Sequence, residues 1–347
     1  MKTSAYDSAK GFIVTYKPLY ETLLFNELNA KCNNIKLFER GKISSAFTTD
    51  DYNQIVNAIR EEGFIFLQHI HPYSADCGIT GCMDDLTAIS EMLNVVVPYI
   101  EDDDSIVVQC RIDTDKVMEF SNRDLTNKLA ERLNASGYHV EPREAEICIS
   151  VTVFQNRAYM GISLIKDNVS DWTGGILFFS KENIISRAEF KIEEAFKVFD
   201  ININNNMRAL DLGAAPGGWT HFLSEKGICV DAVDPACLDD RVLNSDRVTH
   251  FKMTAQEFMR LYPEKCYDII VNDMRMDTNE SVDIMACISE QLKPDGICIL
   301  TLKLPKKNVQ KRINIAREVL SKRFKTVKIR QLYYNRSEVT AFLKNKI

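Results

Sequence analysis

The sequence predicts an α/β protein whose C-terminal part is a Rossmann-like, doubly wound and mostly parallel sheet, preceded by two small α+β modules. A glycine-rich run, Asp211-Leu-Gly-Ala-Ala-Pro-Gly-Gly-Trp-Thr220, joins an apolar strand candidate to a helix candidate. The next strand candidate ends in Asp234, and strand and helix signals then alternate to the end of the chain. Such a turn is typical of a nucleotide-type site at the carboxyl edge of an open sheet.

The composition is that of an ordinary globular protein. The 347 residues are 45% hydrophobic and 27% charged, with a net charge of −6. We expect no membrane span, because no apolar run is long enough, and no secretion signal at the N-terminus. The ten cysteines are scattered, which favours a reducing, cytoplasmic location. Cys77 and Cys82 lack a CxxC spacing and a nearby histidine, so we expect no metal site.

The first 72 residues alternate short strand and helix signals. Strands are predicted over 11–16 and 64–69, and helices over 18–31 and 51–62. We interpret this pattern as β-α-β-α-β, a small α/β module over residues 1–72.

A second module is predicted over residues 73–170. Its expected elements are helices over 86–94 and 122–136, and strands over 106–112, 145–154 and 157–165. Gln155-Asn156 is a plausible hairpin turn between the last two strands. Residues 171–185 have few periodic signals and are predicted to be a linker.

The third predicted domain, residues 186–347, alternates helix and strand. Its expected strands cover 208–212, 228–233, 267–272, 296–303, 326–333 and 337–343. Its expected helices include 187–196, 219–226 and 306–322.

Charged residues stand where three of these strands begin or end. Asp273 follows one strand, Lys303 ends the next, and Glu338 begins the last; Lys191 lies on the helix before the glycine-rich loop. Carboxyl ends of parallel strands meet at one edge, so Asp273 and Lys303 should lie beside a bound ligand. A structural Lys–Asp pair, or a lysine that reaches solvent, would explain the same pattern.

The loop chemistry favours a nucleoside ligand without phosphates. Pro216 removes one backbone amide, and the GxGxxG spacing of a pyrophosphate site is missing. S-adenosylmethionine (SAM) fits this description, whereas an NAD-type oxidoreductase is disfavoured. An ordinary glycine-rich turn is the alternative.

The end of the chain is basic although the protein is acidic. Residues 301–347 hold 14 Lys and Arg but only two acids, Glu318 and Glu338. Such a patch favours contact with the phosphates of RNA or DNA. A solvated helix face is the alternative.

Taken together, the motifs resemble the FtsJ-type ribose 2′-O-methyltransferases. The segments that carry the resemblance are Ser186-Arg-Ala-Glu-Phe-Lys-Ile-Glu-Glu194, the glycine-rich run, Asn272-Asp-Met274, Leu302-Lys-Leu-Pro305 and Arg336-Ser-Glu-Val-Thr340. The family's Lys-Asp-Lys-Glu tetrad falls on Lys191, Asp273, Lys303 and Glu338. Within the family the RlmM branch, which methylates a cytidine ribose of 23S ribosomal RNA, is the most similar. That branch implies a ferredoxin-like module over residues 1–72 and a THUMP-like RNA-binding module over 73–170.

The resemblance implies roles for individual residues. Lys303 would be the proton acceptor, with its pKa lowered by burial and by the Lys191 ammonium. The implied SAM contacts are Ala188, Gly213, Ala215, Pro216, Gly217, Gly218, Trp219, Asp234, Thr254 and Asp273. The implied RNA contacts are Lys306, Lys307, Lys311, Arg312 and Arg336.

This sequence departs from the branch at three of the SAM positions. Thr254 replaces an acid near the adenine, Ala188 replaces a small polar residue, and Ala215 stands where the branch can carry cysteine. We expect a SAM-dependent enzyme acting on large-subunit ribosomal RNA. The alternatives are the same reaction on transfer RNA or small-subunit RNA, and a non-catalytic RNA-binding assembly factor.

Overall fold

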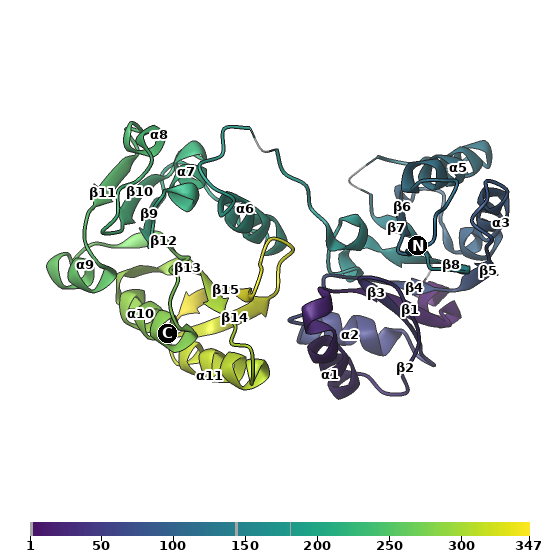
Figure 1. The fold of residues 1–347 in the computed structure, drawn as a ribbon, viewed down its shortest axis with the longest axis horizontal. Coiled ribbons are helices and arrows are strands. Elements are labelled where there is room, and N and C mark those ends of the chain that lie inside the picture. Colours follow the sequence, from purple (N-terminus) through teal and green to yellow (C-terminus); the bar gives the residue numbers. More distant parts are fainter. Residues whose placement is uncertain (1–2, 143–144, 181) are drawn as a thin grey trace. The chain divides into compact units, whose positions relative to one another are not determined.

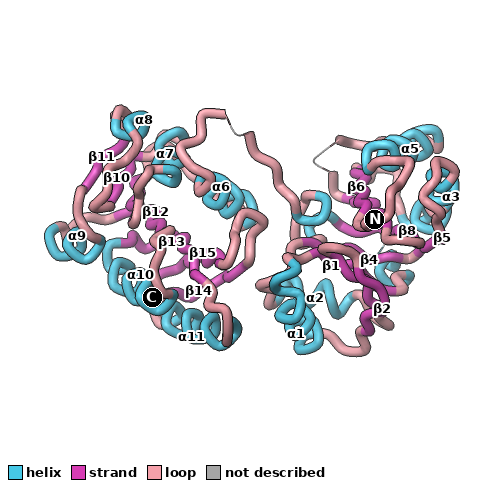
Figure 2. Tube along the Cα trace, viewed as in Figure 1, coloured by secondary structure: helices cyan, strands magenta, loops and turns pink. Residues whose placement is uncertain are grey.

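The computed structural model describes residues 3–142, 145–180 and 182–347 and divides into two compact units, Met1–Ile176 and Leu177–Ile347 (Figure 1). In each unit helices cover strands that form sheets (Figure 2). Within the described ranges, no helix combines the length and the apolar character needed to cross a bilayer.

The N-terminal unit begins with a four-stranded antiparallel sheet. Its elements are β1 (Gly11–Thr15), α1 (Glu21–Lys31), β2 (Lys36–Arg40), β3 (Ser44–Thr48), α2 (Asn53–Glu61) and β4 (His69–Tyr73). The strand order is β2-β3-β1-β4. The chain order β-α-β-β-α-β is that of a ferredoxin-like module.

Two expectations for this segment were wrong. The predicted β-α-β-α-β order has three strands, whereas the structure has four. The sequence analysis missed β2, because its charged sequence has no apolar run and the strand is only half-buried. The strand predicted over 64–69 begins only at His69. The preceding apolar residues are buried, but the backbone N–H groups of Ile65 and Phe66 donate to the Glu27 carboxylate at 3.1 Å.

A second four-stranded sheet completes the N-terminal unit. Its elements are β5 (Ala75–Gly78), α3 (Asp85–Glu91), α4 (Leu93–Val96), β6 (Ile106–Ile112), α5 (Asn122–Ala135), β7 (Ile147–Val153) and β8 (Arg157–Leu164). The order is β5-β8-β7-β6, with β6 and β7 parallel. The expected hairpin is present, since Phe154 N–H donates to the Arg157 carbonyl at 2.9 Å. One face of the sheet joins an apolar core with α3 and α5.

Two buried histidines belong to this unit. His69 Nδ1 lies 3.0 Å from Ser170 Oγ, and His71 Nε2 lies 2.8 Å from Thr152 Oγ1. Burial lowers the pKa of His69 to about 3, and the neighbouring His71 contributes to that decrease. Burial also lowers the pKa of His71 to about 4. Both side chains are therefore neutral in the folded protein at neutral pH.

We expect these histidines to make the protein sensitive to acid. The unfolded chain takes up protons below about pH 6.5, whereas the folded histidines remain neutral until about pH 4 and 3. Stability should therefore fall by up to about 1.4 kcal/mol per pH unit for each histidine below about pH 6.5. Urea unfolding across this range measures the slope. This slope should become shallower in a His69→Gln, His71→Gln double variant. It should not change in His139→Gln, because the His139 side chain is exposed. Equal slopes in all three proteins would contradict the prediction.

The C-terminal unit is a seven-stranded sheet covered by helices. Its elements are α6 (Glu189–Val198), β9 (Arg208–Leu212), α7 (Gly218–Glu225), β10 (Cys229–Val233), α8 (Asp240–Leu243), β11 (Val248–Phe251), α9 (Ala255–Leu261), β12 (Tyr267–Asn272), α10 (Thr278–Ile288), β13 (Leu292–Lys303), α11 (Val309–Ser321), β14 (Phe324–Arg330) and β15 (Glu338–Lys346). The order is β11-β10-β9-β12-β13-β15-β14. β15 alone runs opposite to the other strands of the sheet. The predicted doubly wound, mostly parallel sheet is therefore confirmed.

This topology sets the position of the site. Helices α6 and α7 pack on one face of the sheet, and α10 and α11 pack on the other (Figure 1). The chain order reverses between β9 and β12, which is where ligands bind in open α/β sheets. Because β15 is antiparallel, its first residue lies at the same edge as the last residues of β9, β12 and β13.

Candidate active site

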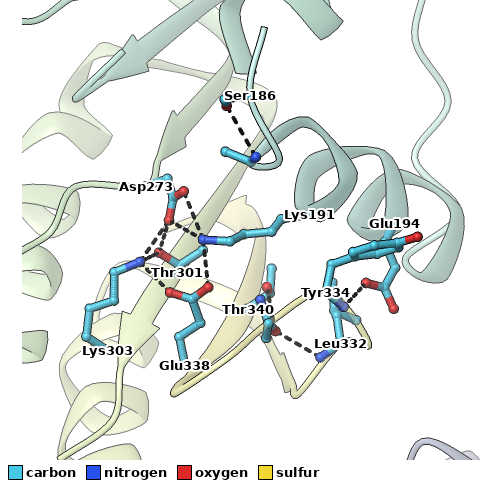
Figure 3. A network of polar contacts seen from close by, with 12 residues as sticks. Ser186, Lys191, Glu194, Asp273, Thr301, Lys303, Leu332, Tyr334, Glu338 and Thr340 are labelled. Atoms are coloured by element: carbon cyan, nitrogen blue, oxygen red, sulfur yellow. Dashed lines mark hydrogen bonds and ion pairs between the residues drawn. The ribbon is translucent and has the colours of Figure 1, made fainter. Parts of the chain in front are cut away.

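Four charged side chains meet at this carboxyl edge (Figure 3). Lys303 Nζ lies 2.8 Å from Asp273 Oδ1 and 2.5 Å from Glu338 Oε2. Lys191 Nζ lies 3.1 Å from Asp273 Oδ2 and 2.6 Å from Glu338 Oε1. The four groups thus form a closed ring of alternating charge, which we call the tetrad.

The backbone explains why these residues meet. Lys303 and Glu338 are register partners on β13 and β15, so they face each other across the strands. Asp273 follows directly after β12, the other neighbour of β13. Lys191 reaches the group from α6. The structure therefore brings together four residues that lie up to 147 positions apart in the sequence.

Thr301 also contacts the tetrad, and the sequence analysis did not identify it. Its hydroxyl donates to Asp273 Oδ1 at 2.6 Å and accepts from Lys303 Nζ at 2.8 Å. The available signal was the spacing, because residues two apart on a strand point to the same face. Thr301 fixes the carboxylate and the lysine relative to each other.

The protonation of the tetrad differs from the expectation. Burial lowers the pKa of Lys303, but the carboxylates of Asp273 and Glu338 raise it by more, so the pKa lies above its usual value. The expected decrease was wrong, because it weighed burial and Lys191 without the two carboxylates that contact the ammonium. Burial raises the pKa of Asp273, and Lys191 and Lys303 lower it by more. Asp273 and Lys303 are consequently both charged at neutral pH.

The glycine-rich loop turns tightly beside Asp273. Gly213 has φ +75°, and a Cβ there would lie 2.3 Å from Met274 Cγ, so the loop after β9 packs against the loop after β12. Gly217 has φ +114° and precedes the first residue of α7. Side chains at these two positions would be strained and would crowd their neighbours. Because neither glycine has a side chain, nothing at these two positions covers the backbone between them, which includes the Ala215–Pro216 peptide.

Three carboxylates lie at the ends of neighbouring strands here. Asp234 accepts from Ala215 N–H at 3.1 Å, which ties the end of β10 to the loop. Burial raises the pKa of Asp211 to about 7; the hydrogen bond from Thr220 opposes this, and the charges of Asp273 and Asp234 add to it. This crowding of carboxylates favours a cationic ligand directly beside the glycine-rich loop and disfavours a phosphate at that position.

Other expected cofactor residues have structural partners. The carbonyl of Ala188 accepts from Trp219 Nε1 at 2.8 Å, and the Trp219 ring is buried in the core. Gly218 lies against Ser186, with room for no Cβ. The Thr254 hydroxyl donates to Glu257 at 2.8 Å and caps α9, so neither it nor the Thr254 N–H is free to donate to an adenine. Ala188 and Thr254 thus have these protein partners in the structure, and their contacts with SAM stay a prediction.

Glu194 is a second residue that the sequence analysis missed. Its buried carboxylate accepts from the backbone N–H groups of Tyr333 and Tyr334 at 2.6 and 2.8 Å (Figure 3). Burial lowers the pKa of Arg330 to about 10, and the charge of Glu194 opposes this decrease. Glu194 lies one turn after Lys191 on α6, so one helix holds both a tetrad lysine and the loop that leads into Glu338. A buried acid at helical spacing from Lys191 was the available signal.

The expected RNA-contact residues do not share one environment. Lys306, Lys307, Lys311 and Arg336 are exposed. Arg312 is only partly exposed, and its Nη1 lies 3.3 Å from Asp277 Oδ1. Arg312 therefore joins the starts of α10 and α11 and has part of its charge neutralised.

Residues 184–340 match the sequence model of the family described as FtsJ-like methyltransferase. The tetrad, the glycine-rich loop and Glu194 all lie within the residues that match this family model.

Curated relatives are similar over different shares of the chain. Ribosomal RNA large subunit methyltransferase M of Azoarcus sp. (strain BH72) is 34% identical over 194 residues, which cover 52% of this chain and 51% of that protein. The protein of the same name from Psychromonas ingrahamii is 24% identical over 365 residues and 95% of both chains. In the first alignment the chain thus spans about half the length of its relative, and in the second nearly all of it.

Among solved structures, TrmN from Thermus thermophilus aligns with 96% of this chain and 99% of its own. The TM-score is 0.43 and the sequence identity is 16%.

Proposed function

We propose that this protein transfers the methyl group of SAM to a ribose 2′ hydroxyl of RNA, with a cytidine of large-subunit ribosomal RNA as the target. The observation that carries the proposal is the closed Lys191–Asp273–Lys303–Glu338 ring beside the glycine-rich loop. The choice of large-subunit RNA rests on the names of the relatives, which are ribosomal RNA large subunit methyltransferases.

The chemistry of the site fits SAM. Bound SAM supplies an electrophilic methyl group on a positively charged sulfonium. Asp234 and Asp273, together with Asp211, which is only partly ionised at neutral pH, give the site a negative character that suits such a cation. The turn at Gly213 and Gly217 brings backbone close to it. Within the set inferred from the resemblance, Gly213, Ala215, Pro216, Gly217, Gly218, Asp234 and Asp273 keep this role, and Trp219 supports the loop from the core.

The tetrad would hold and move the proton of the ribose hydroxyl. Lys303 is our choice for the acceptor, because its Nζ lies at the edge where the substrate must arrive and Asp273, Glu338 and Thr301 fix its direction. Its pKa is raised in the structure, so the acceptor is the minor, neutral form. A second positive charge close to the Lys303 ammonium would increase the fraction of neutral Lys303.

The N-terminal unit would help to select the RNA. We propose the ferredoxin-like module over residues 1–72 and a THUMP-like module over 73–170 for this task. All ten cysteines are free thiols, which supports a reducing compartment such as the cytoplasm.

Mass spectrometry of ribosomal RNA tests the proposal. Nucleosides and RNase fragments from a strain that lacks this protein should have lost one 2′-O-methylcytidine of the large-subunit RNA that the parent strain contains. A plasmid copy of the wild-type gene should restore the mark, and one with Lys303→Ala should not. If every ribosomal mark persists but a transfer RNA mark disappears, the substrate is corrected. If no methyl mark changes in any RNA, the enzyme proposal fails.

A further inference from the structure

An exposed basic residue lies within four sequence positions of every member of the tetrad. These residues are Arg187, Arg275, Lys306 and Arg336, which neighbour Lys191, Asp273, Lys303 and Glu338 respectively. Lys307 adds a fifth exposed cation next to Lys306. We call these five residues the basic rim; Arg187 and Arg275 were not among the expected RNA contacts.

The topology places the basic rim at the catalytic edge of the sheet. Arg275 and Lys306 lie in the loops that follow β12 and β13, and Arg336 lies in the loop that leads into the antiparallel β15. Arg187 lies just before α6, on the segment that packs against the start of α7. Arg187, Arg275, Lys306 and Arg336 thus lie on the same segments of the chain as the four tetrad residues.

The rim cations are not neutralised by neighbours. Among the described residues, no salt bridge within 4.0 Å involves any of the five side chains, whereas Arg312, Arg241 and Lys293 each contact a carboxylate. The tetrad itself holds two positive and two negative charges, so it does not offset the rim. The five rim side chains therefore lack a carboxylate partner within 4.0 Å in the described structure, whereas Asp211 and Asp234 at the same edge contact Thr220 and the Ala215 N–H.

The rest of the molecule does not offer the same attraction. Residues 1–176 carry 16 Lys and Arg against 26 Asp and Glu, while residues 177–347 carry 27 against 23. An acidic N-terminal unit contributes little to the sequence-independent attraction of a polyanion. By net charge, the C-terminal unit is thus the more favourable of the two for attracting RNA.

We propose that the basic rim binds the phosphates on either side of the target ribose in a single-stranded or splayed RNA segment. This inference rests on the proposed function and names the residues that present the substrate to it. Guanidinium groups bind phosphate oxygens in a bidentate manner, and such contacts fix position without reading sequence. A ribose hydroxyl becomes accessible for attack when its nucleotide is unstacked, which is the form in which proteins bind single-stranded RNA.

Salt dependence of binding tests the rim. A fluorescein-labelled, mixed-sequence single-stranded RNA oligonucleotide is titrated with the full chain between about 50 and 200 mM salt. The slope of log K against log salt should become shallower by about 0.7 in Arg275→Gln and again in the Arg187→Gln, Arg275→Gln double variant. Lys325→Gln is the matched control. Lys325 is exposed and without a salt bridge in the described structure, but it lies at the start of β14, at the opposite edge.

The outcomes separate this inference from the proposed function. Unchanged slopes in the rim variants, while the wild type binds RNA and transfers methyl groups, would overturn the rim and leave the function standing. An equal decrease in slope for Lys325→Gln would also overturn it, because the attraction would then be a property of the whole unit. Absence of both salt-dependent RNA binding and methyl transfer in the wild type would overturn the function as well. Calorimetric SAM binding by each variant identifies any that have lost the fold.

Discussion

Replacing Lys303 by alanine should decrease the rate of methyl transfer by about 10²- to 10⁴-fold, the range typical of a lost general base. The lysine contacts Asp273, Glu338 and Thr301, and the glycine-rich loop has its own contacts through Asp234. SAM affinity, measured by calorimetry, should therefore change little. Transfer to RNA is measured with radiolabelled SAM under single-turnover conditions.

A Lys303→Arg variant separates proton transfer from charge. Arginine keeps the positive charge of the ring but cannot be deprotonated in proteins, so this variant should be as inactive as the alanine variant. Lys325→Ala, which removes an exposed lysine from the opposite edge, should keep full activity. An active Lys303→Arg enzyme would show that the charge matters and the proton does not.

The pH dependence gives the same test in the wild-type protein. Because Asp273 and Glu338 raise the pKa of Lys303, the neutral form is scarce at neutral pH and increases about tenfold per pH unit. The single-turnover rate should rise with pH across the neutral and mildly alkaline range. A flat profile would remove Lys303 from the acceptor role.

Replacing Glu194 by alanine should have the largest effect on stability. The substitution leaves the Tyr333 and Tyr334 N–H groups without their carboxylate and removes a negative charge that stabilises the half-buried Arg330 guanidinium. Leaving a buried donor without its acceptor typically costs about 1–3 kcal/mol per group. Urea unfolding measures this loss. The neighbouring Glu193→Ala removes only a surface pair with Lys197 and should cost less than about 1 kcal/mol.

Glu194→Gln tests whether the contacts of Glu194 with the Tyr333 and Tyr334 N–H groups also serve catalysis. The amide oxygen can accept one of the two N–H groups, so this variant should fold better than the alanine variant while holding the loop before Glu338 less firmly. We expect a lower maximal rate with unchanged SAM affinity. Full activity in a variant that has lost stability would assign Glu194 to the fold alone.

The sequence predicts best those elements whose signal is local. Strands β9 and β12 have the predicted bounds, because their buried residues form short apolar runs between turns. Strand β2 was missed because it is charged and half-buried, and β5 because it is only four residues long. A strand of this kind is stabilised by its neighbours in the sheet and not by its own sequence.

The same distinction applies to the site. The four tetrad positions follow from strand ends and from the family resemblance, so the sequence could indicate them. The contacts of Thr301 and Glu194, and the direction of the Lys303 pKa shift, depend on which groups approach from other segments. The capping box that Thr254 forms with Glu257 at the start of α9 is another contact that the sequence analysis did not identify.

The place of β15 in the sheet has a consequence for how the protein folds. This strand is inserted between β13 and β14, so β14 joins the sheet only through β15. The same insertion delivers Glu338 to the lysines. Pairing between segments distant in sequence is the slow part of assembling a sheet. Catalytic competence therefore requires that β15 has paired with β13, and recovery of activity during refolding should report on this pairing and not on the earlier collapse of the chain.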